Sequence, residues 1–245
     1  MLFFGFTISL ANATGHYYLQ LLRTTPEQLK VFSEWLLGKE LLNTSLSNPE
    51  QLHQQRQQRV ILFMDIRGFT QWSEQHLPEE TVTLLGRYYQ TIEQVFHQHQ
   101  IIKWKLSADE VMAIFAQPHE ALSAALQRQR NVSDLLAREQ LGAGIGIHYG
   151  LAVEGILGSN GIKFYNVIGD TVNTAKRIES AARNGEILVS EEMYRVCASR
   201  ILKFTTRTIQ AKGKSHPIII YALSANPAHA KDEQWQAQQP LVKTS

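Results

Sequence analysis

The hydrophobic pattern changes character at residue 60. Val60 to Met64 is a short apolar run bounded by polar sequence, which predicts a buried strand. From Pro78 onward, apolar residues recur at three- and four-residue steps, which predicts a long amphipathic helix. These residues are Val82, Leu85, Tyr89, Ile92 and Phe96. The region from 60 onward therefore predicts a compact domain of mixed helices and strands.

Further elements follow in the same domain. Residues 101–106 and 111–115 predict two strands joined as a hairpin by residues 107–110. A helix is expected over 121–138, and the glycine-rich stretch 142–158 predicts two more strands with close backbone approaches. Asp170 is expected to cap a helix, 186–189 to form a strand, and Ser190 to cap a short helix. Residues 201–223 predict a closing hairpin around 212–214.

The pattern outside the domain is different at each end. Residues 1–23 form an apolar segment with no charged side chain before Arg23, which is about the length of a membrane helix. A membrane helix, or the remnant of one, and a buried or partner-packed helix both remain open. A secretory signal is disfavoured because no basic stretch precedes the apolar part. With a membrane helix, the domain would be anchored at the cell membrane on its cytoplasmic side.

Residues 24–59 predict a helix followed by a polar linker. Thr25, Pro26 and Gln28 are typical of a helix start, with threonine as the cap and proline in the first turn. Residues 43–59 are rich in Asn, Ser and Gln and are interpreted as the linker. At the other end, residues 224–245 turn polar and are expected to be a flexible tail.

Composition excludes several classes of protein. The 245 residues are 44% hydrophobic, which suffices for one sizeable core. A formal net charge of +2 and the lack of a basic stripe argue against a nucleic-acid partner. Cys197 is the only cysteine, which excludes a disulfide framework. The nine histidines show no zinc-ligand spacing.

The stretch LFMDIRGFT (62–70) ends an apolar run on Asp65. An aspartate at a strand end, followed by a glycine turn into a helix, places a carboxylate beside free backbone N–H groups. This combination suits a metal-bound phosphate. Taken alone, Asp65 is better explained as the cap of the next helix.

Two other stretches carry polar side chains at suggestive places. Asp109 lies in the tight turn 107–110, and beside Asp65 it would form a pair of carboxylates that needs a cation. Asn173 and Arg177 fall four residues apart on one helix face, where they would suit a sugar and a phosphate oxygen. An ordinary turn residue and a solvated helix face are the structural alternatives.

Together, in this order, the three stretches resemble the catalytic domains of class III nucleotidyl cyclases. The resemblance covers about residues 58–223 and includes GIGIHYG (144–150), GEILVS (185–190) and AKGKSHPIIIY (211–221). It implies an α+β, ferredoxin-like (βαββαβ) core over 60–223 and a head-to-tail homodimer with shared active sites. It also implies an adenylate cyclase, which converts ATP to cyclic AMP and pyrophosphate in cyclic nucleotide signalling.

The resemblance implies a role for each matching residue. Asp65 and Asp109, helped by the Ile66 carbonyl, would bind two Mg²⁺ (or Mn²⁺) ions per active site. Asn173 would orient the ribose and Arg177 would stabilise the reacting α-phosphate. The remaining substrate-binding positions are Lys105 and Asn166 for the purine, and Gly68, Phe69, Thr70 and Lys212 for the phosphates.

Two departures from the family pattern leave questions open. Ala108 stands where glycine is common, so the turn must adopt a conformation that alanine tolerates. Asn166 stands where adenylate cyclases usually carry aspartate or threonine, and a flipped amide would admit GTP. A guanylate or mixed cyclase is therefore one alternative, and a catalytically silent cyclase-like dimerisation module is another. The Gly-Gly-Asp/Glu-Glu-Phe signature of diguanylate cyclases is absent.

Overall fold

The computed structural model describes residues 25–34, 37–159, 163–200, 204–210 and 217–224. Contacts divide the chain into two compact units. One consists of residues up to 53 together with 155–165, and the other of residues 54–154 together with those from 166 onward. The predictions for residues 1–23, Lys212 and the tail after 224 lie outside the described residues.

The first unit is helical at its N-terminal end. A helix runs over 25–34, so Thr25 is a helical residue and not the predicted cap. It is followed by α2 (Lys39–Ser47) and η1 (Pro49–Leu52). The expectation of a polar linker over 43–59 is wrong, because α2, η1 and the first residues of β1 occupy this stretch. Leu42 and Leu52 are buried, and this apolar packing holds the segment in helical form. In the described residues, no helix combines the length and apolar character that crossing a bilayer requires.

The second unit contains the predicted βαββαβ core. Its strands are ordered β2-β3-β1-β4-β6-β8-β7, and β5 pairs with β4 outside this path. The pairs β1–β3, β1–β4 and β2–β3 are antiparallel, and β4–β6 is parallel. The core elements are β1 (Gln55–Arg67), α3 (Phe69–Glu74), α4 (Pro78–Phe96), β2 (Ile101–Ser107), β3 (Glu110–Phe115), α5 (Pro118–Ala137) and β4 (Gly142–Gly158). The later elements are β5 (Lys163–Ile168), α6 (Asp170–Ser180), β6 (Glu186–Ser190), α7 (Glu191–Cys197), η2 (Ala198–Arg200), β7 (Thr205–Ile209) and β8 (Ile218–Ser224).

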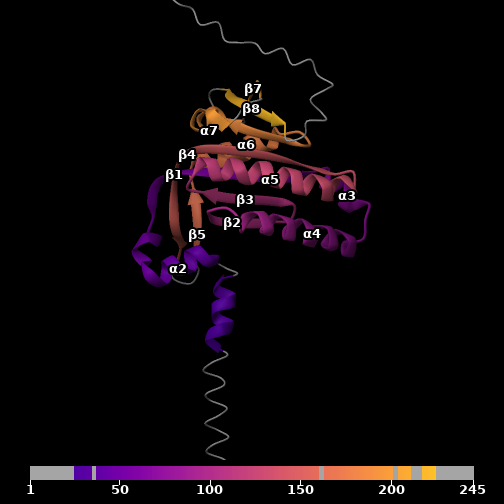
Figure 1. The fold of residues 1–245 in the computed structure, drawn as a ribbon. Coiled ribbons are helices and arrows are strands. Elements are labelled where there is room, and N and C mark those ends of the chain that lie inside the picture. Colours follow the sequence, from indigo (N-terminus) through magenta and orange to yellow (C-terminus); the bar gives the residue numbers. More distant parts are fainter. Residues whose placement is uncertain (1–24, 35–36, 160–162, 201–203, 211–216, 225–245) are drawn as a thin grey trace, which may run out of the picture. The chain divides into compact units, whose positions relative to one another are not determined.

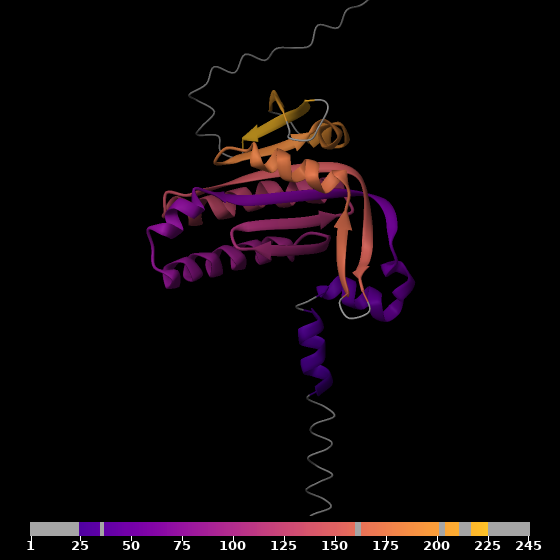
Figure 2. The same cartoon turned by 180° about the vertical axis from the view of Figure 1, so that it is seen from behind.

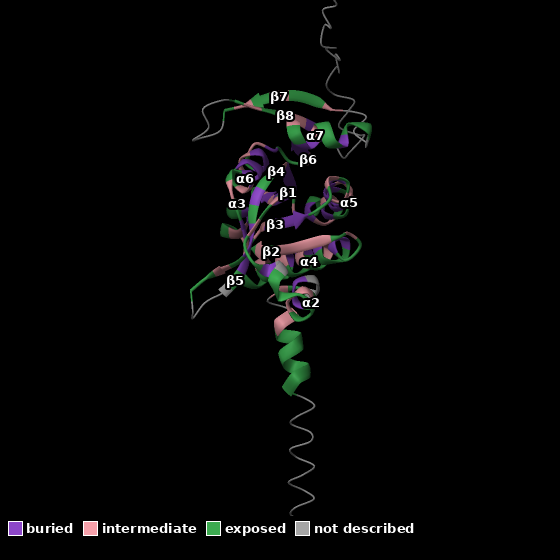
Figure 3. Cartoon of the chain, turned by 90° about the vertical axis from the view of Figure 1, so that its left-hand side faces the viewer, coloured by how far each residue is buried: buried purple, intermediate pink, exposed green. Residues whose placement is uncertain are grey.

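Strand β1 is buried on both of its faces. Successive side chains of a strand point to opposite faces. Val60, Leu62, Met64 and Ile66 accordingly join the core under α4 and α5, which lie on one side of the sheet. Ile61 and Phe63 join a second core that includes Ala175 of α6, on the opposite side of the sheet. In Figure 3, where buried residues are purple, the buried part of the sheet lies between the helices that cover its two faces.

Three local predictions need correction. Residues 142–158 form the single strand β4 rather than two strands. Asp170 is the first residue of α6, whose N-cap is Gly169, so Asp170 is not the cap. Val82 is exposed in α4, where Leu84, Tyr88 and Ile92 face the core instead. By contrast, Ser190 accepts a hydrogen bond from the Met193 N–H and caps α7 as predicted.

Glycines in β4 allow α6 to lie directly against the strand. A Cβ added to Gly146 would lie 2.1 Å from the backbone nitrogen of Glu179. A Cβ added to Gly144 would lie 2.5 Å from a guanidinium nitrogen of Arg67. The predicted close backbone approaches are thus confirmed, and they place the C-terminal part of α6 beside the end of β1.

Candidate functional site

Asp65 and Asp109 meet at one end of the sheet. Asp65 has the parity of Ile61 and Phe63, so its side chain points to the face that α6 covers. The carboxyl group of Asp109 lies within hydrogen-bonding reach of this carboxyl group, and one of the two must carry a proton to form the hydrogen bond. Burial raises the pKa of the Asp65 carboxyl to about 6, with this hydrogen bond and the negative charge of Asp109 as the next causes. Two half-buried carboxylates at this separation favour a cation between them.

The turn that carries Asp109 is held from behind by α4. The Tyr88 hydroxyl donates to the Asp109 carbonyl oxygen at 3.1 Å, and the Tyr89 hydroxyl donates to the Ala108 carbonyl oxygen at 2.8 Å. Ala108 has φ 52°, in the left-handed region that disfavours a side chain by about 1–2 kcal/mol. The two tyrosine hydrogen bonds therefore help to fix a conformation that alanine tolerates only at a cost.

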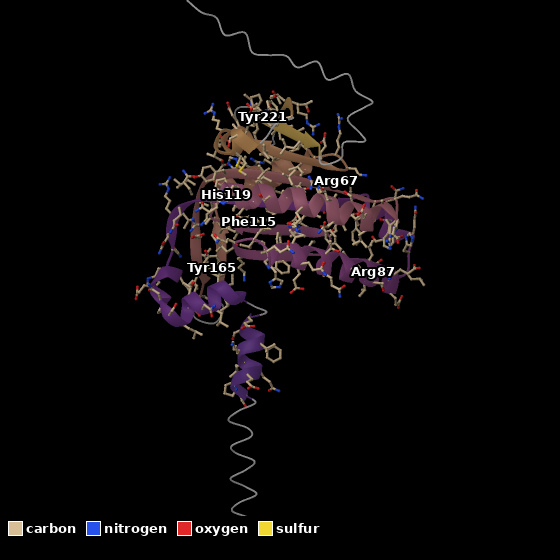
Figure 4. The ribbon with its side chains drawn as sticks, viewed as in Figure 1. Arg67, Arg87, Phe115, His119, Tyr165 and Tyr221 are labelled. Carbon is tan, nitrogen blue, oxygen red and sulfur yellow. The ribbon has the colours of Figure 1, made fainter. Side chains whose placement is uncertain are left out.

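Arg67 links Asp65 to α6. Its Nη1 lies 3.4 Å from Asp65 Oδ2, and its Nη2 lies 2.5 Å from Glu179 Oε1. Its Nε donates to the Ala182 carbonyl oxygen at 2.9 Å. Arg67 is labelled in Figure 4. Glu179 is fully buried, and the ion pair with Arg67 offsets part of the cost of burying its charge.

Lys176 links the same glutamate to the Asp109 turn. Its Nζ lies 2.6 Å from Glu179 Oε2 and 2.5 Å from Glu110 Oε2. The connected group thus contains four carboxyl groups and two cations, and it carries a net charge of −2 when every carboxyl is ionised. This excess of negative charge, concentrated at Asp65 and Asp109, suits a divalent cation.

The metal prediction was tested against the donors present. Mg²⁺ prefers oxygen ligands and usually binds through one or two carboxylates plus substrate phosphates. Asp65 and Asp109 supply such a pair, whereas no group of three or more His, Cys, Asp or Glu side chains with metal-holding geometry occurs in the described ranges. The donor set therefore fits metal ions that share their coordination with a phosphate group.

The turn after Asp65 carries the three residues predicted to contact the phosphates. Gly68 has φ 82°, a left-handed conformation that glycine adopts at no cost, and it precedes the short helix α3. Phe69 is buried and Thr70 is exposed. Ile66 pairs with Ala143 of β4, and its side chain lies in the core. The predicted phosphate-binding segment thus follows directly on the carboxylate pair.

The predicted ribose and α-phosphate contacts lie on α6. Asn173 is exposed and Arg177 is partly exposed, one turn further along the helix. Within the described part of the chain, neither side chain makes a hydrogen bond or ion pair, whereas Lys176 and Glu179 of the same helix are fully engaged. Asn173 and Arg177 are therefore available to a ligand or a second chain.

The two predicted purine contacts lie on strands. Lys105 is exposed on β2, at the edge of the sheet, and also makes no hydrogen bond within the described residues. Asn166 lies on β5, and its Oδ1 accepts a hydrogen bond from the Val167 N–H at 3.0 Å. One lone pair of this oxygen stays open, and the amide nitrogen is also free to donate.

Comparison with known proteins assigns the family. Residues 52–225 match the family described as the adenylate and guanylate cyclase catalytic domain, which is more than half of the chain. The chain belongs to the class III nucleotidyl cyclases. The α+β fold that the sequence predicted is therefore that of a nucleotidyl cyclase catalytic domain.

Individual class III cyclases support the assignment. An adenylate cyclase of Mycobacterium tuberculosis is 32% identical over 164 residues, which is 63% of this chain but 37% of that protein. The guanylyl cyclase Cya2 matches with a TM-score of 0.64 and 28% identity, covering 69% of this chain and 92% of that one. The adenylyl cyclase CyaB from P. aeruginosa matches with a TM-score of 0.63 and 29% identity, covering 70% and 95%. Relatives thus include cyclases named for either nucleotide.

Sequence reasoning missed the residues that support the carboxylate pair. Arg67 and Lys176 lie inside the motifs that the resemblance rests on, but neither has a role in those motifs. The three-residue spacing of Lys176 and Glu179 indicates an ion pair on one helix face. Nothing in the sequence indicates that Glu179 is fully buried, because that depends on Gly144 and Gly146 of a strand distant in sequence.

Proposed function

We propose that this cyclase domain converts ATP to 3′,5′-cyclic AMP and pyrophosphate as a head-to-tail homodimer. The observation that carries the proposal is the meeting of Asp65 and Asp109 on the α6-covered face of the sheet, directly before the Gly68 turn. A lone capping aspartate would not need a second carboxylate within hydrogen-bonding distance. The arrangement instead fits a triphosphate that arrives with its metal ions.

Asp65 and Asp109, with the Ile66 carbonyl, would hold two Mg²⁺ (or Mn²⁺) ions. When bound, such ions lower the proton affinity of the ribose 3′-hydroxyl and neutralise charge on the triphosphate. The protein's part is to keep both carboxylates at fixed positions and to bring N–H donors of Gly68, Phe69 and Thr70 near the phosphates. Lys212 is proposed to contact the terminal phosphates.

Arg177 and Asn173 complete the site. Arg177 would donate to the α-phosphate oxygens, where charge develops during attack, and Asn173 would hold the ribose in line. Neither side chain has a hydrogen-bond or ion-pair partner within the described residues, whereas Lys176 and Glu179 of the same helix pair with each other. We therefore assign them to the active site of the partner chain, with Lys105, Asp65 and Asp109 on the first.

Exposed apolar residues of the larger unit offer a contact surface for the dimer. Leu151 and Val153 of β4 are 40% and 38% exposed, and Ile168 at the end of β5 is 53% exposed. Apolar side chains exposed together on neighbouring strands are typical of a surface that a partner covers. A second copy of the chain fits this surface and would supply the missing half of each site.

Base selection is proposed to favour ATP through Lys105. The lysine ammonium can donate to adenine N1, whereas guanine presents an N1–H donor at that position. The open lone pair of Asn166 Oδ1 can accept from the adenine amine. All catalytic positions carry competent residues, so we do not favour a silent module.

One observation supports GTP as a second substrate. Because the Val167 N–H already binds Asn166 Oδ1, the amide nitrogen is left to donate, which suits the O6 acceptor of guanine. We therefore expect a modest preference for ATP rather than exclusion of GTP.

The test is a parallel assay of the purified chain with ATP and GTP, each with Mg²⁺ and with Mn²⁺. The proposal predicts cyclic AMP from ATP as the main product and a smaller yield of cyclic GMP from GTP. Formation of neither cyclic nucleotide by folded protein would contradict cyclase activity. More efficient use of GTP would contradict only the choice of substrate.

A further inference from the structure

Lys176 joins two elements that carry different parts of the site. Its Nζ contacts Glu110, which directly follows Asp109, at 2.5 Å. Lys176 itself directly precedes Arg177 on α6. A single side chain thus connects the turn of one predicted metal ligand to the helix that carries the predicted α-phosphate contact.

The other contact of Lys176 is with a fixed residue. Glu179 Oε2 lies 2.6 Å from Nζ, while Glu179 Oε1 and the Glu179 carbonyl oxygen each lie 2.5 Å from Arg67 Nη2. Glu179 is fully buried, so it has little freedom to follow Lys176. Lys176 therefore extends from an anchored point toward the turn.

Side chains of two helices contact this turn. Tyr88 and Tyr89 bind its backbone carbonyls from α4, and Lys176 binds Glu110 from α6. The pairing of Ser107 with Glu110 closes the hairpin itself, but Ala108, at φ 52°, makes the turn costly to hold in place. Without Lys176, the turn would lose its ion pair with α6.

We propose that Lys176 is a positioning residue that fixes Asp109 at the separation from Asp65 that a divalent cation requires. The proposal rests on the proposed cyclase function. It assigns Lys176 to the metal half of the site of its own chain, although its neighbour Arg177 serves the site of the partner chain. One turn of α6 would thus support both active sites of the dimer.

The direction in which Mn²⁺ affinity changes when Lys176 is replaced distinguishes a positioning role from a simple charge effect. As a nearby positive charge, Lys176 repels a cation, so its removal by Lys176→Met would strengthen Mn²⁺ binding. As a positioning residue, its removal frees the turn and weakens Mn²⁺ binding. We expect binding about tenfold weaker, the lower end of the effect of losing a residue that orients metal ligands.

The first experiment measures Mn²⁺ binding to the full chain by electron paramagnetic resonance, without nucleotide. Lys176→Arg is the matched control, because it keeps the charge and can still reach both glutamates, and we expect it to remain within about twofold of the native affinity. Glu110→Gln tests the other end of the contact, and combined with Lys176→Met it should add little further loss of Mn²⁺ affinity.

Unchanged or tighter Mn²⁺ binding in folded Lys176→Met protein would overturn the proposal. If Lys176→Met fails to fold, the Glu110→Gln variant is the test. Mn²⁺ affinity of folded Glu110→Gln protein equal to that of the native protein would then overturn the proposal.

The second experiment places Lys176→Met on a chosen chain of a heterodimer. Asp109→Ala and Arg177→Ala chains together form one intact site, whose carboxylates come from the Arg177→Ala chain. Lys176→Met on that chain should raise the Mn²⁺ concentration for half-maximal rate about tenfold, and on the Asp109→Ala chain less than about twofold. Equal effects on both chains would overturn the assignment to the same chain. An inactive heterodimer without Lys176→Met would contradict the shared-site function instead, and the Mn²⁺ binding result would still decide the role of Lys176.

Discussion

Asp65 near the end of β1 and Asp109 in the turn between β2 and β3 bring their carboxyl groups within hydrogen-bonding reach, although more than forty residues of sequence separate them. Burial and mutual repulsion make this pair unfavourable on its own, because each negative charge disfavours the other. The surrounding residues Arg67, Lys176 and Tyr88 hold it in place nonetheless. A pair maintained at such a cost is expected where a cation-bound substrate is used.

Removing either carboxylate should abolish activity without unfolding the domain. For Asp65→Ala or Asp109→Ala, we expect kcat/KM to fall at least about a thousandfold, because the remaining carboxylate cannot hold the metal ions alone. Thermal unfolding without metal should occur at the native temperature or above, since the substitution relieves repulsion. Near-normal turnover by either folded variant would contradict the assignment of these residues to the metal.

Base selection should depend on Asn166. Leaving a buried polar group unpaired costs about 1–3 kcal/mol, so discrimination of roughly ten- to a hundredfold in favour of ATP is expected. Asn166→Asp should increase this ratio, because a carboxylate cannot offer a donor to guanine O6. The measurement is kcat/KM for ATP and GTP in both proteins. A ratio that stays the same or falls in the aspartate variant would exclude Asn166 from base recognition.

The contact between β4 and α6 makes a prediction about stability. Gly146→Ala would place a Cβ 2.1 Å from the Glu179 backbone nitrogen, so we expect the free energy of unfolding to fall by about 2–3 kcal/mol. Gly86→Ala is the control, because no atom lies within 4 Å of its added Cβ and alanine favours the interior of α4. Equal stability of the two variants in urea denaturation would contradict this packing.

An ion pair far from the site predicts a pH dependence of stability. His99 Nδ1 lies 2.8 Å from Glu120 Oε2, and this hydrogen bond lowers the pKa of Glu120 below its usual value of 4.5. A lowered pKa stabilises the fold above pH 4.5, and this stabilisation is lost as pH falls through the folded-state pKa.

Glu120→Gln should therefore be less stable than the native protein at pH 6 by about 0.5–1 kcal/mol, since the pair is partly exposed. The difference should shrink as the pH is lowered below 4. Urea denaturation of both proteins over this range is the measurement. A difference that is constant with pH would mean that the charge of Glu120 has no stabilising role.

The sequence predicted the parts of the fold that depend on local pattern. The apolar run before Asp65, the 101–115 hairpin and the Ser190 cap all have local signals, and the structure contains them. The prediction of a linker over 43–59 is wrong because α2 and η1 are stabilised by a few buried leucines, and the sequence shows no regular apolar pattern there. The single long strand β4 was not recognised because its glycines resemble turn residues in sequence.

Sequence likewise predicts only some of the residues of the candidate site. Asp65, Asp109, Asn173 and Arg177 were found because their motifs carry the resemblance. Arg67, Lys176 and Glu179 were not, because their role depends on contacts between β1, β3 and α6 that lie more than sixty residues apart in sequence. Whether Asn166 presents its oxygen or its nitrogen also depends on a backbone contact that sequence does not reveal.

The central claim is that one active site needs Asp109 from one chain and Arg177 from another. The most direct measurement mixes Asp109→Ala protein with Arg177→Ala protein, each inactive alone, and follows cyclic AMP formation after heterodimers have been verified. Random pairing makes about half of the dimers heterodimers with one intact site of two, so activity near a quarter of the native value is expected. Verified heterodimers that remain as inactive as their parents would contradict the account.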